Sequence, residues 1–562
     1  MVLGSYPYVW LVVIFMVAFF AVRLGVGWWA SRKVANTADY VVAGRRLPVY
    51  MAAASIMATW FAAETLMGAS STAYQYGFQG VVFDPFGAAL CLFISGVFFI
   101  RMMRRAKYLT LVDFFERRFS KPMVILSCIA QILTYFAWTG AQIVAGGNIA
   151  HALFGWPVEA GMIGIIVIVA AYTTLGGLLA DTVLDFMQMF FTAGGITLIF
   201  VSVLKAVGGF PGLFEGAGSM YVSDPFTLMP IVDEGYLGYQ GPMGWMYWLA
   251  AWMAVGLGSV ATQDLMQRSM AARNQATSVY GSYFAGVLYL FFGIMSPLIG
   301  IMMFKLNPNI AADQTEFLLV TAALEHLAPV FTALFLAALT AALMSTSDSS
   351  LLAGASITTE NLIPAIIGRK LNDKESLRGT RIMVVVNALI GIVIALVATT
   401  IYDLAVLAWS LLLVGLFVPF AFGMYWKKAN SYGAVSAFIG GFAIWAISIW
   451  FFTNNGIGGP STSIVCEGDA DCAFWDAVYI GSFVAFASSL ILMIVVSLAT
   501  QKINAPKPIT DYFGKPLVSN FKQNVGWLPL WDALRKLRKD EEDELETEEK
   551  MPLPAPEPSP GD

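Results

Sequence analysis

Apolar runs long enough to cross a bilayer recur along this chain, and they constrain its fold more than any other feature. They fall between Tyr8 and Thr500. A membrane-spanning helix needs about 20 apolar residues, because the hydrocarbon layer is about 30 Å thick. Of the 562 residues, 58% are hydrophobic and 12% are charged, about half the charged share of a soluble protein. We therefore predict an all-α polytopic membrane protein.

The positions of the apolar runs predict about 13 transmembrane helices. Their expected starts are near Tyr8, Pro48, Val81, Pro122, Gly161, Leu184, Gly244, Val279, Ala328, Met383, Leu404, Ala434 and Ala477. The first run has no basic region before it and no small-residue cleavage site, so it is interpreted as a helix and not as a signal peptide.

Charged residues in alternate loops predict the orientation of these helices. One set of loops is basic, at 31–33, 101–107, 116–121, 267–274, 368–381 and 426–428. The other set is acidic, at 232–236, 313–316, 402–403 and 466–476. Because Lys and Arg are retained in the cytoplasm, we expect a multi-pass protein of the plasma membrane with its N-terminus outside and its C-terminus inside.

Residues 501–562 differ in composition and are expected to form a cytoplasmic tail. Within 525–539 the large apolar side chains share one helical face, so this segment either lies on the inner leaflet or docks on the protein as a solvated helix. The acidic and proline-rich end beyond it is expected to be disordered.

The four cysteines fall into two pairs. Cys91 and Cys128 lie in apolar runs and are interpreted as packing residues. Cys466 and Cys472 flank the loop sequence EGDAD and would close a small disulfide if the loop faces an oxidising compartment. Two free loop thiols fit the sequence equally well.

The second span is poorly suited to be a plain membrane helix. Its sequence, VYMAAASIMATWFAAETLMGASSTAYQYG, is rich in small and hydroxyl residues and contains Glu64. Interrupted backbone at membrane depth is tolerated where it is buried or lines a cavity. A carboxylate at that depth indicates a functional site.

The segment LTAALMSTSDSSLLAGAS, at 339–356, places many oxygens in an apolar run. Ala342, Ser345, Thr346 and Ser349 fall on one stripe of a helix. Hydroxyls so spaced, with carbonyls from a broken partner helix, are ligands for a hard cation, and few carboxylates favour a monovalent ion such as Na⁺. Small and hydroxyl residues also let helices pack closely, which is the alternative. Asp348 lies off the stripe and is not expected to be a ligand.

A third segment, YTTLGGLLADTVLDFMQ at 172–188, joins two spans through a glycine pair. Gly176 and Gly177 permit a tight turn. Asp181 is expected to cap or flank the following helix at the membrane interface. Asp185 lies deeper and requires an ion, a hydroxyl network or a cationic side chain as its partner.

These segments, together with GSVATQDLMQR at 258–268, resemble the signatures of the sodium:solute symporter family. The resemblance extends from about residue 5 to 500 and implies the leucine-transporter-type fold of two inverted five-helix repeats. A symporter domain at 1–500 would then consist of helix 1 at about 8–30, the repeat core at about 48–426 and two further helices at about 434–500.

The resemblance also implies binding residues. The main sodium site would use the carbonyls of Ala58, Phe61 and Ala342 with the hydroxyls of Ser345 and Thr346. In some members Asp185 joins a second sodium site with serines one turn along, here Ser349 and Ser350. Whether one or two sodium ions move per cycle stays open.

The motifs are nearest to the choline-transporter branch of the family. Trp60 and Trp138 align with two tryptophans of its aromatic cage, whereas Ala88 and Thr262 replace the other two aromatic residues. Glu64, Thr262 and Gln263 are assigned to the solute site with the two tryptophans. With half a cage, an amino acid such as proline or a small carboxylate is as plausible as choline, and ordinary packing would also account for both tryptophans.

The predicted function is sodium-coupled import of a small organic solute by alternating access, with Na⁺ as coupling ion and no cofactor or nucleic acid. A sodium-conducting channel would show rings of one ligand type, which are not visible. A transporter-like sensor would need a signalling domain larger than this tail. An enzyme would need a catalytic set, which the sequence does not provide around its two histidines, His151 and His326.

Overall fold

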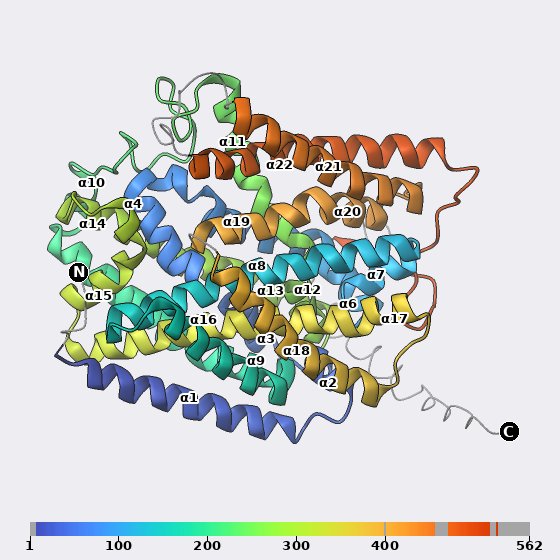
Figure 1. Ribbon diagram of the computed structural model, residues 1–562, viewed down its shortest axis with the longest axis horizontal. Helices are drawn as coiled ribbons and strands as arrows, with labels where there is room; N and C mark the ends of the chain where they lie inside the picture. The colour runs from blue at the N-terminus through green and yellow to red at the C-terminus, as the bar shows by residue number, and fades with distance from the viewer. Residues whose placement is uncertain (1–6, 398–400, 456–469, 518–523, 526–562) are drawn as a thin grey trace.

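The computed structural model describes residues 7–397, 401–455, 470–517 and 524–525, which form a bundle of helices running along one common direction (Figure 1). Helix α1 (Val9–Ser31) lies at one side of the bundle, and α21 (Ser431–Asn455) packs with α22 (Ala470–Ala499) at the opposite side. The described residues contain isolated β-bridges but no named strand. The all-α prediction is confirmed.

A first set of five spans follows the short α2 (Thr37–Val42) and η1 (Ala43–Arg45). Its first span is broken: α3 (Val49–Trp60) is followed by η2 (Glu64–Gly68) and α4 (Ala69–Gly80), with a bend of 61°. The other elements of the set are η3 (Val82–Gly87), α5 (Ala88–Ile94), η4 (Ser95–Phe99), α6 (Ile100–Ala106), α7 (Val112–Arg118), α8 (Lys121–Phe154) and α9 (Val158–Ala206).

A second set follows α10 (Gly209–Phe214) and also begins with a broken span. Here α11 (Gly241–Gly256) is separated from α12 (Gln263–Ala271) by η5 (Gly258–Ala261). The remaining elements are α13 (Gln275–Gly293), α14 (Met295–Leu306), η6 (Ala312–Phe317), α15 (Leu318–His326), α16 (Pro329–Ile357), η7 (Thr358–Leu362), α17 (Ile363–Ile367), α18 (Asp373–Ala395), α19 (Ile401–Leu412), η8 (Leu413–Phe417) and α20 (Val418–Tyr425).

The two sets run in opposite directions. Helix α3 begins beside the basic residues Arg45 and Arg46, whereas α11 begins after the acidic loop at 232–236. Among the residues that the structure describes, ten helices, or eleven with the bent pair, are long and apolar enough to cross a membrane. Two differences separate this count from the 13 predicted spans. Helix α9 is counted once although it bends at Gly177 into two arms, and α11 is not counted because it has only 16 residues before the break that precedes α12.

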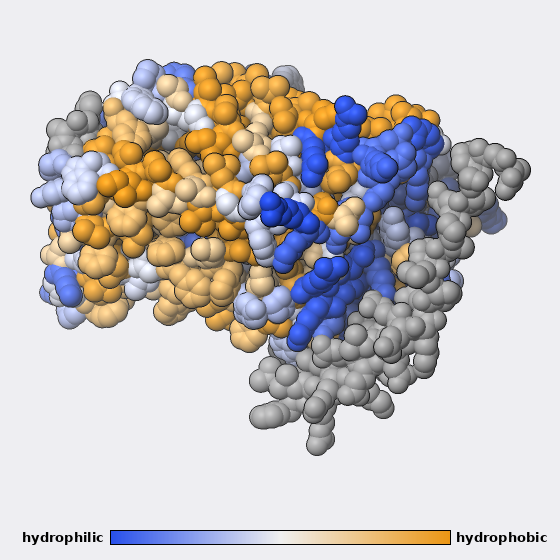
Figure 2. All heavy atoms as spheres, turned by 90° about the horizontal axis from the view of Figure 1, so that it is seen from below, coloured by the Kyte–Doolittle hydropathy of each residue, from blue (hydrophilic) through white to orange (hydrophobic). Residues whose placement is uncertain are grey.

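The surface has the polarity of a membrane protein. Hydrophobic side chains cover most of the face that contains α1, and hydrophilic ones gather towards the end at which α2 and α17 lie (Figures 1 and 2). Trp10, Ile14 and Val17 of α1 are each more than half exposed, as expected of side chains that face lipid.

The first residues of the tail pack against the same end of the bundle. The Lys507 ammonium donates to the Phe119 carbonyl at 2.6 Å, and the Tyr512 N–H donates to the Ala106 carbonyl at 2.9 Å. The predicted helix at 525–539 and Cys466 lie outside the described residues, and so does the side chain of Cys472, so the disulfide stays a prediction. Cys91 and Cys128 are buried free thiols, in agreement with their predicted packing role.

The bend in α9 depends on a residue without a Cβ atom. Gly177 has φ 57° and ψ −159°, a region that is essentially restricted to glycine. A Cβ atom there would lie 2.6 Å from the Tyr40 ring and carbonyl.

We expect Gly177→Ala to destabilise the protein by about 1–3 kcal/mol, because backbone strain and this clash act together. Thermal unfolding of the purified protein in detergent measures the effect. Gly194→Ala in the same helix is the matched control, since a Cβ atom there meets nothing within 4 Å. Equal unfolding temperatures for the two variants would contradict this account of the bend.

Candidate functional site

The break in the first span is joined directly to α16. Helix α3 ends at Trp60, and the Thr346 hydroxyl of α16 donates to the Thr59 carbonyl at 2.7 Å. Ala58 and Phe61 flank this carbonyl in the chain and are buried, as are Ala342 and Ser345 on α16. The structure therefore brings the predicted sodium-binding segments of α3 and α16 together, although Thr346 contacts the Thr59 carbonyl, which lies between those of Ala58 and Phe61 in the chain.

Asp185 is shared between the two segments. Its carboxylate accepts from the hydroxyl of Ser345 on α16 and from that of Ser55 on α3, the latter at 2.6 Å. Because Asp185 is fully buried in α9, these hydroxyls supply the partners that the sequence required. Asp185, which was predicted for a second sodium site, is thus hydrogen-bonded to Ser345, which was predicted for the main sodium site.

A guanidinium lies where a second cation was expected. Arg268 of α12 donates to Asp181 and to Ser349, and it donates to the Ser55 hydroxyl at 3.0 Å. Its nitrogen also lies 3.8 Å from Asp185. Ser350 faces elsewhere, with its hydroxyl 2.6 Å from that of Thr139. The structure does not bring Asp185, Ser349 and Ser350 together as one ligand set.

Two expectations from the sequence are wrong in this region. Asp181 does not flank a helix at the membrane interface, because it is 4% exposed and paired with Arg268 inside the bundle. The basic segment at 267–274 is not simply a loop, because its first five residues belong to α12 and are buried. Arg268 can be buried in the interior because it faces the carboxylates of Asp181 and Asp185 on α9.

Asp348 also has a buried cationic partner. The Arg23 guanidinium of α1 lies 3.8 Å from the Asp348 carboxylate, and it donates to the Tyr172 hydroxyl at 2.9 Å and to the Gln188 side chain. Ser347 is buried and donates to the Leu343 carbonyl of its own helix at 2.8 Å. Arg23 was not predicted from the sequence, although a lone arginine inside an apolar span indicates a buried partner.

The predicted solute residues gather on the other side of the break. The Trp138 indole donates to Glu64 at 2.9 Å, and Gln142 donates to the same carboxylate at 2.8 Å. The Trp60 indole donates to Asp264 at 2.7 Å. Glu64, Trp60 and Trp138 are each at most 2% exposed, so the region is closed to solvent from both sides of the membrane.

The other two predicted solute residues form hydrogen bonds with backbone groups of the protein. The Thr262 hydroxyl donates to the Ser259 carbonyl at 2.9 Å, and the side-chain amide oxygen of Gln263 accepts from the Leu111 N–H at 2.6 Å. The Gln263 amide nitrogen has no partner among the described residues.

Two buried carboxylates of this region were not predicted. Asp264 accepts from the Tyr135 hydroxyl at 2.9 Å as well as from Trp60. Asp84 accepts from Thr65 at 2.6 Å and from the Tyr289 hydroxyl at 2.8 Å. A carboxylate next to an interrupted span, the signal that identified Glu64, identifies both of them too.

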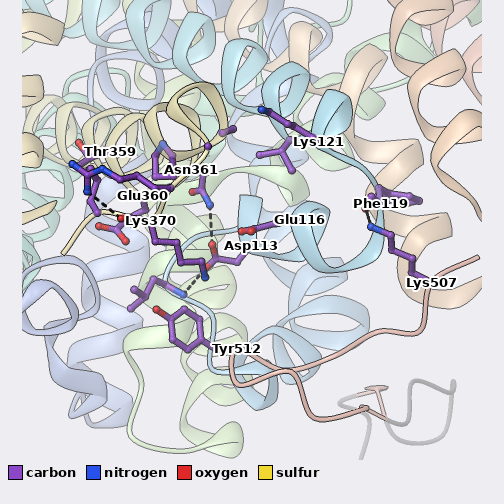
Figure 3. A pocket seen from close by; sticks show the side chains of 17 residues that line it. Asp113, Glu116, Phe119, Lys121, Thr359, Glu360, Asn361, Lys370, Lys507 and Tyr512 are labelled. Atoms are coloured by element: carbon purple, nitrogen blue, oxygen red, sulfur yellow. Dashed lines mark hydrogen bonds between the residues drawn. The ribbon is translucent and has the colours of Figure 1, made fainter. Parts of the chain in front are cut away.

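A separate cavity of about 520 Å³ opens at the end of the bundle that has the basic loops (Figure 3). Side chains of both charges line it, including Asp113, Glu116, Lys121, Glu360 and Lys507. It contains none of the residues predicted to bind ion or solute.

Comparisons with known proteins agree with this geometry. A profile described as the sodium:solute symporter family matches residues 40–441. The chain is 26% identical over 459 residues to the osmoregulated proline transporter OpuE of Bacillus subtilis (strain 168), which covers 79% of this chain and 89% of that protein. It is 26% identical over 466 residues to the high-affinity choline transporter 1 of Torpedo marmorata, covering 77% of this chain and 75% of that protein.

A solved structure of similar fold is that of a Na⁺-coupled sialic acid symporter in a substrate-bound outward-open state. The TM-score is 0.70 at 18% identity, and the match covers 89% of this chain and 99% of that chain. At this identity the likeness concerns the fold, and it confirms the leucine-transporter-type architecture that the sequence predicted.

We expect Arg268→Gln to lower the free energy of unfolding by about 3–5 kcal/mol, because it leaves buried carboxylates without their cation. Adding Asp181→Asn should recover part of that loss, since the pair is coupled. Thermal unfolding of the single and double variants in detergent checks this. Arg369→Gln, which breaks an exposed pair with Glu375, should have little effect. Additive losses in the double variant would contradict the pairing.

Proposed function

The chain belongs to the sodium:solute symporter family, a family of transporters and not of enzymes, and from this premise we propose that it imports a small organic solute together with sodium. The observation that supports the proposal most directly is the bond from Thr346 to the Thr59 carbonyl, which places α16 against the break in α3. Both segments contribute oxygen atoms at the same point inside the bundle.

These oxygens fit a sodium ion. The Thr346 and Ser345 hydroxyls, carbonyls at the end of α3 and the Asp185 carboxylate are hard ligands that together carry one negative charge. The hydroxyls now donate to Thr59 and Asp185, and their lone pairs would turn to a bound cation. Sodium would thereby fasten α3 to α16 and favour the state in which the solute region is complete.

Transport would use the electrochemical gradient of sodium. Each unit charge that crosses the membrane contributes about 2.3 kcal/mol per 100 mV. Because the residues at the break are buried, ion and solute can reach them only through conformational change, as alternating access requires. In the orientation that we propose, the basic loops and the tail lie in the cytoplasm.

We further propose that one sodium ion moves per cycle. Asp185 and Ser349, predicted for a second sodium, are both within reach of Arg268, whose charge is fixed to the protein. A second cation at the same carboxylate would be repelled by the guanidinium.

The sodium site is tested by Ser345→Ala combined with Thr346→Ala. We expect this double variant to lose sodium-dependent uptake in proteoliposomes, because two ligands and the link to α3 disappear together. Ser347→Ala is the matched control, since its hydroxyl is bonded only within α16, and it should transport normally. Unimpaired sodium dependence in the double variant would exclude this ion site.

The stoichiometry is tested by the dependence of initial uptake on sodium concentration. A single sodium ion predicts a hyperbolic curve with a Hill coefficient of about 1, because the coefficient is limited by the number of interacting sites. The charge moved per solute, recorded in the same proteoliposomes, gives an independent measure. A sigmoidal curve with a coefficient near 2 would contradict the assignment of one sodium.

A further inference from the structure

Three buried carboxylates surround the breaks of the two interrupted spans without a cationic partner. Glu64, Asp84 and Asp264 are each at most 2% exposed. Their hydrogen-bond donors are neutral groups, namely indoles, an amide and hydroxyls. None of the ion pairs among the described residues includes any of the three.

On the side of the break where the sodium site is proposed, positive and negative charges are nearly balanced. There, Arg23 and Arg268 face Asp181, Asp185 and Asp348, which leaves one excess negative charge. The proposed sodium ion would neutralise it. Arg268 approaches Asp264 only through that residue's carbonyl, at 3.4 Å, while its remaining contacts are directed at Ser55, Asp181 and Ser349.

Around the break, carboxylates without an ion pair are therefore found on the solute side and not on the ion side. Removing an ionised carboxylate from water costs several kcal/mol unless a cation compensates for it. Buried carboxylates at membrane depth thus require a positively charged partner or protons. Neither arginine forms an ion pair with Glu64 or Asp264, although the charge of Arg268 acts on Asp264 from a longer distance.

Unpartnered polar groups next to these carboxylates point to a bound molecule. The Trp409 indole N–H has no partner among the described residues, and the side chain is 3% exposed. Its ring lies 5.5 Å from that of Trp138, the donor to Glu64, and 5.2 Å from that of Phe83, which precedes Asp84. The Gln263 amide N–H is also free, in the residue before Asp264.

A third such group lies on α8. Both amide atoms of Gln131 lack a partner among the described residues, and this side chain is fully buried. Gln131 is one helical turn before Tyr135, the residue that binds Asp264. A buried donor without a protein acceptor can donate to an acceptor on whatever molecule occupies the region.

We propose that the solute is a protonated primary or secondary amine, carrying a net positive charge, whose N–H groups bind Glu64 and Asp264. This inference rests on the proposed function. Each carboxylate has lone pairs beyond those used by its present donors, so it can accept from an ammonium group. Oxygen or nitrogen acceptors elsewhere on the solute would bind the free N–H groups.

The same residues argue against the other solute classes. An anionic carboxylate would add a further negative charge to a region whose carboxylates already form no ion pair. A quaternary ammonium has no N–H group and depends on an aromatic cage, of which Ala88 and Thr262 occupy two positions. The indoles of Trp60 and Trp138 instead direct their N–H groups at the carboxylates.

The first test measures uptake into proteoliposomes with and without a sodium gradient. Labelled putrescine and ethanolamine are compared with choline, proline and acetate, and butane-1,4-diol serves as the neutral analogue of putrescine in competition. We expect sodium-driven uptake of at least one of the two amines, with no competition by the diol. Sodium-driven uptake of choline, proline or acetate alone would overturn the amine assignment and leave the proposed function intact.

The two proposals fail in different ways. Amine uptake that ignores the sodium gradient would overturn the proposed coupling and leave the solute assignment intact. If no probe is transported, thermal stabilisation of the unmodified protein decides the matter. Stabilisation by the amines but not by the diol supports the assignment, and no difference between them overturns it.

The second test changes the charge of the site and keeps its shape. Glu64→Gln and Asp264→Asn should each raise the apparent KM for the amine at least about 30-fold, because one member of a buried charge pair is lost. Asp476→Asn is the matched control, a half-buried carboxylate outside the site that accepts from Tyr239 and Tyr247, and it should stay within about twofold.

Folding of the variants is checked by their sodium-induced thermal stabilisation, which requires the ion site but not the two carboxylates. A folded Glu64→Gln or Asp264→Asn protein with an unchanged KM would overturn the proposal.

Discussion

The structure depends on one constraint: ionised groups inside a membrane protein must find their partners within the protein or among its ligands. Hydrocarbon supplies no compensating charge, and an unpaired carboxylate there is costly. Arg23 in α1 and Arg268 in α12 satisfy the carboxylates of α9 and α16 on one side of the break. On the other side Glu64, Asp84 and Asp264 have only neutral hydrogen-bond donors, and in our proposal a cationic solute compensates for Glu64 and Asp264.

The broken spans make this arrangement useful. An intact helix consumes its own carbonyls, whereas an interrupted one leaves oxygens and N–H groups available in the interior. The break after Trp60 provides the Thr59 carbonyl to Thr346, and the break before Gln263 places Asp264 beside Trp60 and Tyr135. The ion region and the solute region therefore share the same short stretch of α3, which gives sodium a physical route to influence solute binding.

Much of the candidate site was accessible from residue type and spacing. The hydroxyl stripe on α16, the unusual composition of the second span and the glycine pair in α9 all indicated their structural roles. The sequence did not indicate which cationic side chains pair with the buried carboxylates. Arg268 stood in a segment whose basic residues suggested a loop, and Arg23 stood alone in an apolar span. Periodicity indicates which face of a helix is polar but not which of many helices that face meets.

The sequence by itself determined that the chain is a multi-span helical membrane protein whose second span is unsuited to a plain helix, because these properties follow from local composition and helical geometry. Only the tertiary structure decided the pairings: Arg23 with Asp348 is separated by more than 300 positions in the chain, and Arg268 with Asp181 by 87. Such contacts are fixed by how the helices pack. Packing directs Arg268 at the carboxylates of α9 and leaves the carboxylates of the solute region without an ion pair.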